Sequence, residues 1–189
     1  MDKPLIIPNF VSDQDCMLLA SYIEDTHLSY TGKAHDDKRF IDQFGKDNYH
    51  KKSKLRLEGL GDIHPIIVKY FKKILSTCQT TFSDNDKMDI SSIWFSKQIQ
   101  GSVLPVHSDV DDGSNDQVSY SVVLYLNNVD RSGELQFPTL DFSYKPQMGD
   151  AVIWKSDDVR FDHGVSEIVD TRYSLPIWVT KHPEYFLPY

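Results

Sequence analysis

Hydrophobic positions repeat at helical spacing in two stretches of the first half of the chain. The first stretch follows Ser12, a suitable N-cap, and its apolar face carries Cys16, Leu19, Ala20 and Ile23. The second follows Asp62, which we take as its N-cap, and an apolar stripe runs along residues 63–78. Its opposite face carries lysines at positions 69, 72 and 73. The sequence therefore predicts two amphipathic helices.

After residue 87 the hydrophobic period changes from helical to alternating. One face of the segment 118–126 is apolar and the other is more polar. Near the end, one face of a second alternating segment carries Arg172, Ser174, Pro176 and Trp178. Pro176 cannot donate a backbone hydrogen bond, so it favours an edge strand or a bulge. Two helices followed by roughly eight short strands predict a mainly β protein, a double-stranded β-helix (jelly roll) with N-terminal helices packed on its outer face.

Length and composition favour one domain over residues 1–189, with helical support in 1–85 and a jelly-roll core in 86–181. The only cysteines, Cys16 and Cys78, lie at apolar helix positions, which indicates buried thiols and a reducing compartment. No secretory leader or membrane-length apolar run occurs, so we expect a soluble cytoplasmic protein without membrane partners. The formal net charge of −8 argues against broad nucleic-acid binding.

The most informative chemical motif is His107-Ser108-Asp109, followed at a distance by His163 and Arg172. Alternate residues of a strand point to the same side, so His107 and Asp109 would share one space. A histidine from a distant strand would complete two imidazoles and one carboxylate, the ligand set of non-haem Fe(II) oxygenases. An arginine nearby could grip a carboxylate with two hydrogen bonds. Taken alone, the same triplet could be a solvated surface pair and the arginine a rim residue.

The order of motifs over residues 120–128, 133–138, 149–154, 162–165 and 172–178 resembles the prolyl 4-hydroxylase-like branch of the 2-oxoglutarate and Fe(II)-dependent oxygenases. The resemblance covers about residues 90–180, and residues 5–12 more loosely. It implies that Fe(II) is bound by His107, Asp109 and His163. It further implies that Arg172 binds the C5 carboxylate of 2-oxoglutarate, with Ser174 and Tyr125 beside it. Oxygen would be the second co-substrate and ascorbate a reductant.

One position departs from that family pattern. Many relatives carry a tyrosine ten residues before the first metal-binding histidine, and here that position is Lys97. Either the strand register shifts and Phe95 fills the space, or a lysine lies near the pocket.

The segment 26–56 is long, polar and rich in charge, and residues 46–56 within it form a basic cluster. In relatives the corresponding segment folds over the active site, so we expect a lid whose cluster contacts substrate. A merely solvated face is the alternative.

The expected activity is hydroxylation of an unactivated C–H bond, in the first instance of a prolyl residue in a peptide or protein partner. Free amino acids or a nucleobase remain alternative substrates. A jelly-roll module that binds a metal or ligand without turnover is a rival, because function belongs to the site and not the fold. A zinc hydrolase is disfavoured, since no general base stands out beside the triad. The oligomeric state is not predicted.

Overall fold

The computed structural model describes residues 2–25, 51–53, 60–110 and 118–189 of the chain. The basic cluster and most of the expected lid lie outside these residues, with only the backbone of 51–53 described. The acidic loop at 111–117 lies outside them as well. The α-helices are α1 (Asp13–Asp25) and α3 (His64–Thr81), and short 3-10 helices occur at Gly61–Ile63, Pro138–Leu140, Val159–Phe161 and Pro183–Tyr185.

Both predicted helices form, but only the first begins where the sequence indicated. The Ser12 hydroxyl accepts a hydrogen bond from the backbone N–H of Asp15 at 3.3 Å, which confirms it as the N-cap of α1. The prediction of Asp62 as the cap of α3 is wrong. The chain enters α3 through the 3-10 turn Gly61–Ile63, so the cap position falls on Ile63, and Pro65 lies in the first turn, where a missing N–H is harmless.

The strands form two sheets in which every neighbouring pair is antiparallel. The larger sheet has the order β1-β9-β6-β11-β4-β2, with β3 also paired to β11. Its strands are β1 (Leu5–Ile7), β2 (Lys51–Ser53), β3 (Asp89–Ile93), β4 (Phe95–Gln98), β6 (Val118–Tyr125), β9 (Ala151–Lys155) and β11 (Arg172–Thr180). The smaller sheet, in the order β5-β10-β7-β8, contains β5 (Leu104–His107), β7 (Leu135–Phe137), β8 (Phe142–Tyr144) and β10 (His163–Val165).

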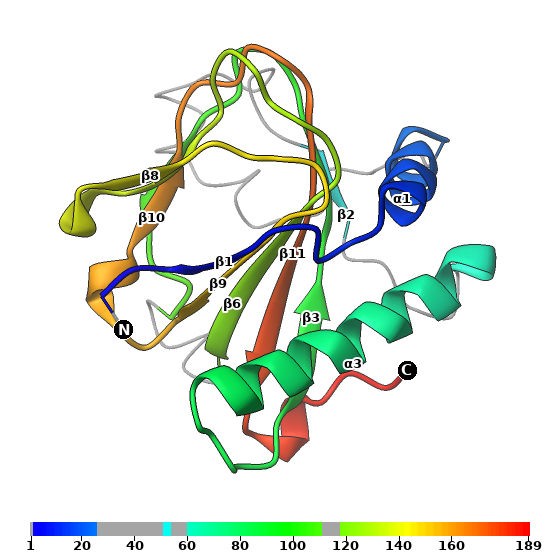
Figure 1. The fold of residues 1–189 in the computed structure, drawn as a ribbon, viewed down its shortest axis with the longest axis vertical. Coiled ribbons are helices and arrows are strands. Elements are labelled where there is room, and N and C mark those ends of the chain that lie inside the picture. The colour runs from blue at the N-terminus through cyan, green and yellow to red at the C-terminus, as the bar shows by residue number, and fades with distance from the viewer. Residues whose placement is uncertain (1, 26–50, 54–59, 111–117) are drawn as a thin grey trace.

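The larger sheet is covered on both faces. The two helices lie on one side of it, and the smaller sheet lies on the other (Figure 1). Successive side chains of β6 point to opposite faces of this sheet. Val122 and Leu124 join the core beneath the helices, while Val123 and Tyr125 join the core between the sheets. Strand β6 therefore contributes side chains to the cores on both of its faces. The predicted fold class, a jelly roll with N-terminal helices on its outer face, is confirmed.

The expectation that Pro176 marks an edge or a bulge is wrong, because β11 is a central strand with β6 on one side and β3 and β4 on the other. The ring is accommodated where β3 has ended and β4 has not begun. There the Pro176 carbonyl accepts the N–H of Trp94 at 2.8 Å, while no donor is required of the proline.

Cys16 and Cys78 are buried free thiols, as the sequence indicated. Neither α1 nor α3, nor any other helix in the described ranges, is long and apolar enough to cross a membrane.

Candidate metal centre

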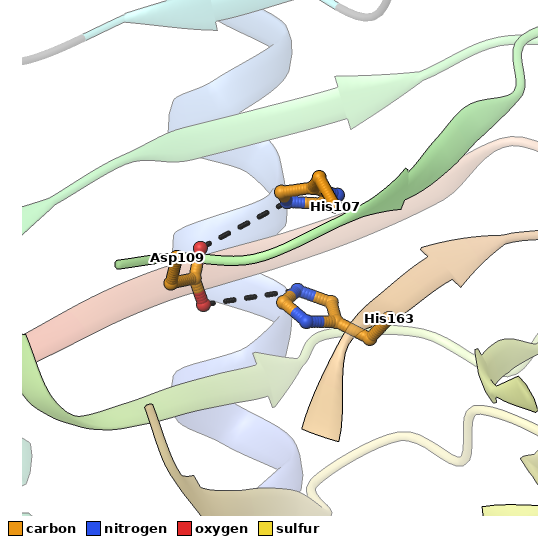
Figure 2. A group of neighbouring side chains, drawn as sticks. All are labelled: His107, Asp109 and His163. Atoms are coloured by element: carbon orange, nitrogen blue, oxygen red, sulfur yellow. Dashed lines mark ion pairs between the residues drawn. The ribbon is translucent and has the colours of Figure 1, made fainter. Parts of the chain in front are cut away.

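His107, Asp109 and His163 meet at the end of the smaller sheet, between the two sheets (Figure 2). His107 ends β5 and His163 begins β10, and the two residues are direct partners across the antiparallel pair. Gly164 makes this approach possible: a Cβ atom there would lie 2.7 Å from the Leu104 carbonyl oxygen. One ligand atom from each member of the triad lies within 4.8 Å of the others. The structure thus brings together the three residues that the sequence singled out.

Each imidazole is held so that the same nitrogen faces the centre. The Nδ1 atom of His107 lies 3.0 Å from the Pro105 carbonyl oxygen, and that of His163 lies 3.1 Å from the Phe161 carbonyl oxygen. A carbonyl only accepts, so Nδ1 carries the hydrogen and Nε2 keeps its lone pair. Both Nε2 atoms face Asp109, at 3.8 Å from Oδ1 for His107 and 3.7 Å from Oδ2 for His163. This tautomer is the one that binds a metal.

The Asp109 carboxylate is the charged member of the triad, and its side chain is only 8% exposed. Burial by itself raises its pKa, but the charges of His163 and His107 when these are protonated, together with hydrogen bonds from Ser121 and the Trp178 side chain, lower it below its usual 3.8. At neutral pH the group is therefore an ionised carboxylate. Two neutral imidazoles and one carboxylate are donors that fit Fe(II).

The triad lines a pocket that encloses about 500 Å³, the open mouth included. Arg172, at the start of β11, lines the same pocket and is 3% exposed. Its guanidinium donates to Gln98 Oε1 and, at 3.1 Å, to the Tyr125 hydroxyl, while its Nε has no hydrogen-bond partner among the described residues. No carboxylate in the described part of the chain forms an ion pair with it. A buried cation with an unused donor is suited to bind an anionic ligand.

Tyr125 and Ser174 lie beside Arg172 as the resemblance implied, but in different ways. Tyr125 is fully buried, and the Arg172 guanidinium stacks 5.0 Å from the centre of its ring. Burial raises the pKa of its phenol although Arg172 acts in the other direction, so the hydroxyl keeps its proton and can still donate it. Ser174 follows Arg172 on the same face of β11 and lines the pocket directly.

Neither expectation for position 97, where many relatives carry a tyrosine, is right. Phe95 packs in the core beneath the helices, and Lys97 pairs with Glu24 of α1 at 2.6 Å, so both side chains lie on the face of β4 away from the pocket. Instead, Ser96 and Gln98 line the pocket from β4. The sequence analysis missed these two residues. Strand alternation is the signal that could have found them, because residues 96 and 98 share one face of β4. Across the strand pair, Ser96 lies opposite Ser174 and Gln98 lies opposite Arg172.

A jelly roll that holds two imidazoles, a carboxylate and a buried arginine in one pocket defines a class, the non-haem iron oxygenases. Residues 93–180 match the family model described as the 2OG-Fe(II) oxygenase superfamily. Over those residues the chain is similar to this superfamily. Family and donor set together imply Fe(II) as the metal and 2-oxoglutarate as the co-substrate.

Solved structures with the same fold bear names from the prolyl hydroxylases. A viral collagen prolyl hydroxylase from Paramecium bursaria Chlorella virus-1 is 17% identical, with a TM-score of 0.72 over 93% of this chain and 94% of that one. A Pseudomonas putida prolyl-4-hydroxylase is also 17% identical, with a TM-score of 0.69 over 95% and 92%.

A Trichoplax adhaerens prolyl hydroxylase, in complex with a hypoxia inducible factor peptide fragment, is 15% identical, with a TM-score of 0.71 over 98% of this chain and 86% of that one. At these identities the likeness shows the fold. Comparison of the sequence with curated proteins gives no match.

Proposed function

We propose that this oxygenase hydroxylates a prolyl residue of a peptide or protein. In this proposal His107, Asp109 and His163 hold Fe(II), and Arg172 binds the far carboxylate of 2-oxoglutarate. The observation that supports it most is the placement of a buried cation, which has no carboxylate partner among the described residues, in the same pocket as the triad. The same placement favours turnover over a jelly-roll module that only binds, because such a module has no need of a dicarboxylate clamp beside a metal.

The residues of the chain have distinct tasks. The bound iron supplies the oxidising chemistry, in which 2-oxoglutarate is decarboxylated to succinate and one oxygen atom enters the substrate C–H bond. His107 and His163 present lone pairs from fixed tautomers, and Asp109 balances part of the positive charge. Arg172 and the Tyr125 hydroxyl orient the co-substrate by hydrogen bonds to its distal carboxylate. Apolar walls from Trp154 and Val165 limit water in the pocket.

The prolyl substrate class rests on fold similarity to prolyl hydroxylases, one of them in complex with a peptide. The test is succinate release from 2-oxoglutarate with Fe(II) and oxygen, with and without a library of proline-containing peptides. We expect stimulation by some of these peptides, which then gain the mass of one oxygen atom, and none by the same peptides with alanine at the proline. Stimulation by free amino acids or nucleosides alone would assign a different substrate class. Binding of 2-oxoglutarate without any release of succinate would favour the binding module.

Arg172 offers a sharper test of the co-substrate site. Loss of a charge-assisted contact to a buried carboxylate costs roughly 2–5 kcal/mol, so Arg172→Ala should weaken 2-oxoglutarate binding by at least ~30-fold while the metal stays bound. The matched control is Arg131→Ala, because Arg131 is an exposed arginine that pairs with Asp170 at 2.5 Å. Unchanged affinity in Arg172→Ala, measured calorimetrically, would remove Arg172 from the co-substrate site.

A further inference from the structure

Gln98 is a buried polar side chain that the triad chemistry does not use. It ends β4 directly opposite Arg172 on β11, is 3% exposed, and lines the pocket. Its Oε1 atom accepts a hydrogen bond from Nη1 of Arg172. On the same face, the neighbouring cross-strand pair is Ser96 with Ser174. The wall around the arginine therefore consists of neutral hydrogen-bonding groups.

The orientation of the Gln98 amide follows from the chemistry of its partner. A guanidinium has five N–H donors and no acceptor, so the carbonyl oxygen and not the NH2 group must face it. Tyr125 accepts from the other terminal nitrogen, Nη2. Two neutral acceptors thus hold the two terminal nitrogens of Arg172, and the plane of the guanidinium is fixed before any ligand arrives.

Neutral acceptors fix the arginine without cancelling its charge. A carboxylate at position 98 would hold the guanidinium equally firmly, but it would neutralise the cation in a buried site where electrostatic interactions are strong. An apolar side chain would preserve the charge but leave Nη1 without its acceptor and the guanidinium free to turn. An amide meets both requirements.

We propose that Gln98 is the positioning residue that makes this pocket selective for 2-oxo acids ending in a second carboxylate. It acts through Arg172, and the inference rests on the proposed role of Arg172 as the anchor of the co-substrate. Gln98 contributes by keeping that anchor both oriented and fully charged.

The experiment measures binding and not turnover. Protein loaded with Mn(II) in the absence of oxygen is titrated with 2-oxoglutarate and with 2-oxopentanoate, which has the same chain length but ends in a methyl group. The variants are Gln98→Leu, which removes the acceptor, and Gln98→Glu, which keeps side-chain length and the contact to Arg172 but adds a negative charge. Lys97→Ala is the control. Lys97 is next to Gln98 in the sequence, but its side chain pairs with Glu24 on the opposite face of β4. Thermal unfolding of each variant checks the fold.

In the wild-type protein we expect a strong preference for 2-oxoglutarate. A hydrogen bond to a charged group is worth about 1.5–3 kcal/mol, so Gln98→Leu should bind 2-oxoglutarate about tenfold or more weakly, with little change for 2-oxopentanoate. Gln98→Glu should lose still more of the preference, and Lys97→Ala none.

Preserved selectivity in folded Gln98→Glu overturns the inference, even if Gln98→Leu fails to fold. A wild-type protein that binds 2-oxoglutarate no better than 2-oxopentanoate overturns the proposed anchor itself. The two failures are thereby distinguished.

Discussion

The two oxygens of the Asp109 carboxylate have different neighbours. Oδ2 accepts the Ser121 hydroxyl at 2.6 Å, and Ser121 in turn lies 2.7 Å from the Ser156 hydroxyl. Oδ1 faces Nε2 of His107. Oδ2 also lies 3.7 Å from Nε2 of His163, so Ser121 fixes the rotation of a carboxylate that has one oxygen facing each imidazole. Groups that orient a ligand in this way contribute to metal affinity although they never touch the metal.

Replacement of Ser121 tests that contribution. Ser121→Ala should weaken Mn(II) binding by roughly 10–100-fold, since loss of an orienting partner of a metal ligand typically has such an effect. Metal titration under anaerobic conditions measures the change. Ser119→Ala, two residues earlier on β6, should leave the affinity at the wild-type value. Equal affinities for the two variants would mean that Asp109 is oriented by Trp178 alone.

At the residue scale the triad was predicted from the His-x-Asp motif and a distant histidine, but strand alternation is not the reason that it forms, because β5 ends at His107 and Asp109 lies in the bend after the strand. Gln98 was not predictable in the same way. Its partnership with Arg172 depends on the pairing of β4 with β11, and counting back from His107 led to Lys97, which faces the helices. Successive residues of a strand point to opposite faces of the sheet. Counting residues back from His107 therefore identified the strand, but not which of its residues face the pocket.

At the element scale, one polar cluster joins the loop after α3 to the end of β11. The Asp84 carboxylate accepts hydrogen bonds from Tyr120 of β6 and from Lys181, whose Nζ lies 2.5 Å away. Burial raises the pKa of Asp84, but the hydrogen bonds from Lys181 and Tyr120 outweigh it and hold the pKa below 3.8. The folded pKa is thus lower than the unfolded one. The ionised carboxylate stabilises the fold above the unfolded pKa, and this contribution disappears as the pH falls through the folded pKa.

Asp84→Asn should therefore lower the free energy of unfolding at pH 7 by about 1–3 kcal/mol, the cost of weakened hydrogen bonds to a largely buried group. Urea unfolding at several pH values should show the difference from wild type shrinking as the pH falls below 3.8. Asp86→Asn provides the comparison, because the Asp86 side chain is 70% exposed and its carboxylate pairs with the same Lys181 at 3.0 Å. A difference that stays constant down to the acid transition would show that Asp84 acts through packing and not through its charge.

The elements themselves were predicted unevenly. The long apolar stripe gave α3, although the 3-10 turn before it displaced its start. Strands β1 and β2 were missed, because three residues are too few for a period to be recognised and both lie in the part expected to be helical support. They pair with β9 and β4, and it is tertiary pairing that makes them strands.

For the molecule as a whole, the layer order followed from the sequence, but the pairing did not. Two helices followed by short strands predicted helices outside a jelly roll, whereas the neighbours of each strand are set by contacts distant along the chain. The single domain over residues 1–189 stays a prediction.

Both cysteines report on the integrity of the core. Burial raises the pKa of Cys16 to about 11 and that of Cys78 to about 12, so neither forms the reactive thiolate at pH 8. In native conditions we expect both thiols to react with an aromatic disulfide reagent only at the rate of unfolding, and promptly in concentrated urea. The absorbance of the released thiolate measures both rates. Fast labelling of either thiol without urea would indicate that the layer between α1, α3 and the larger sheet opens independently.

The pairing of His107 with His163 links metal binding to the stability of the smaller sheet. These residues are opposite partners, and just beyond them the register of β5 and β10 shifts around Gly164. An ion coordinated by both imidazoles would act as a clip across that irregular junction, joining two short strands of the smaller sheet. A ligand that binds only the folded form at a hundred times its dissociation constant adds about 2.7 kcal/mol of stability. Chelation would then loosen the smaller sheet first, while the larger sheet, braced by the helices, would retain its amide protection.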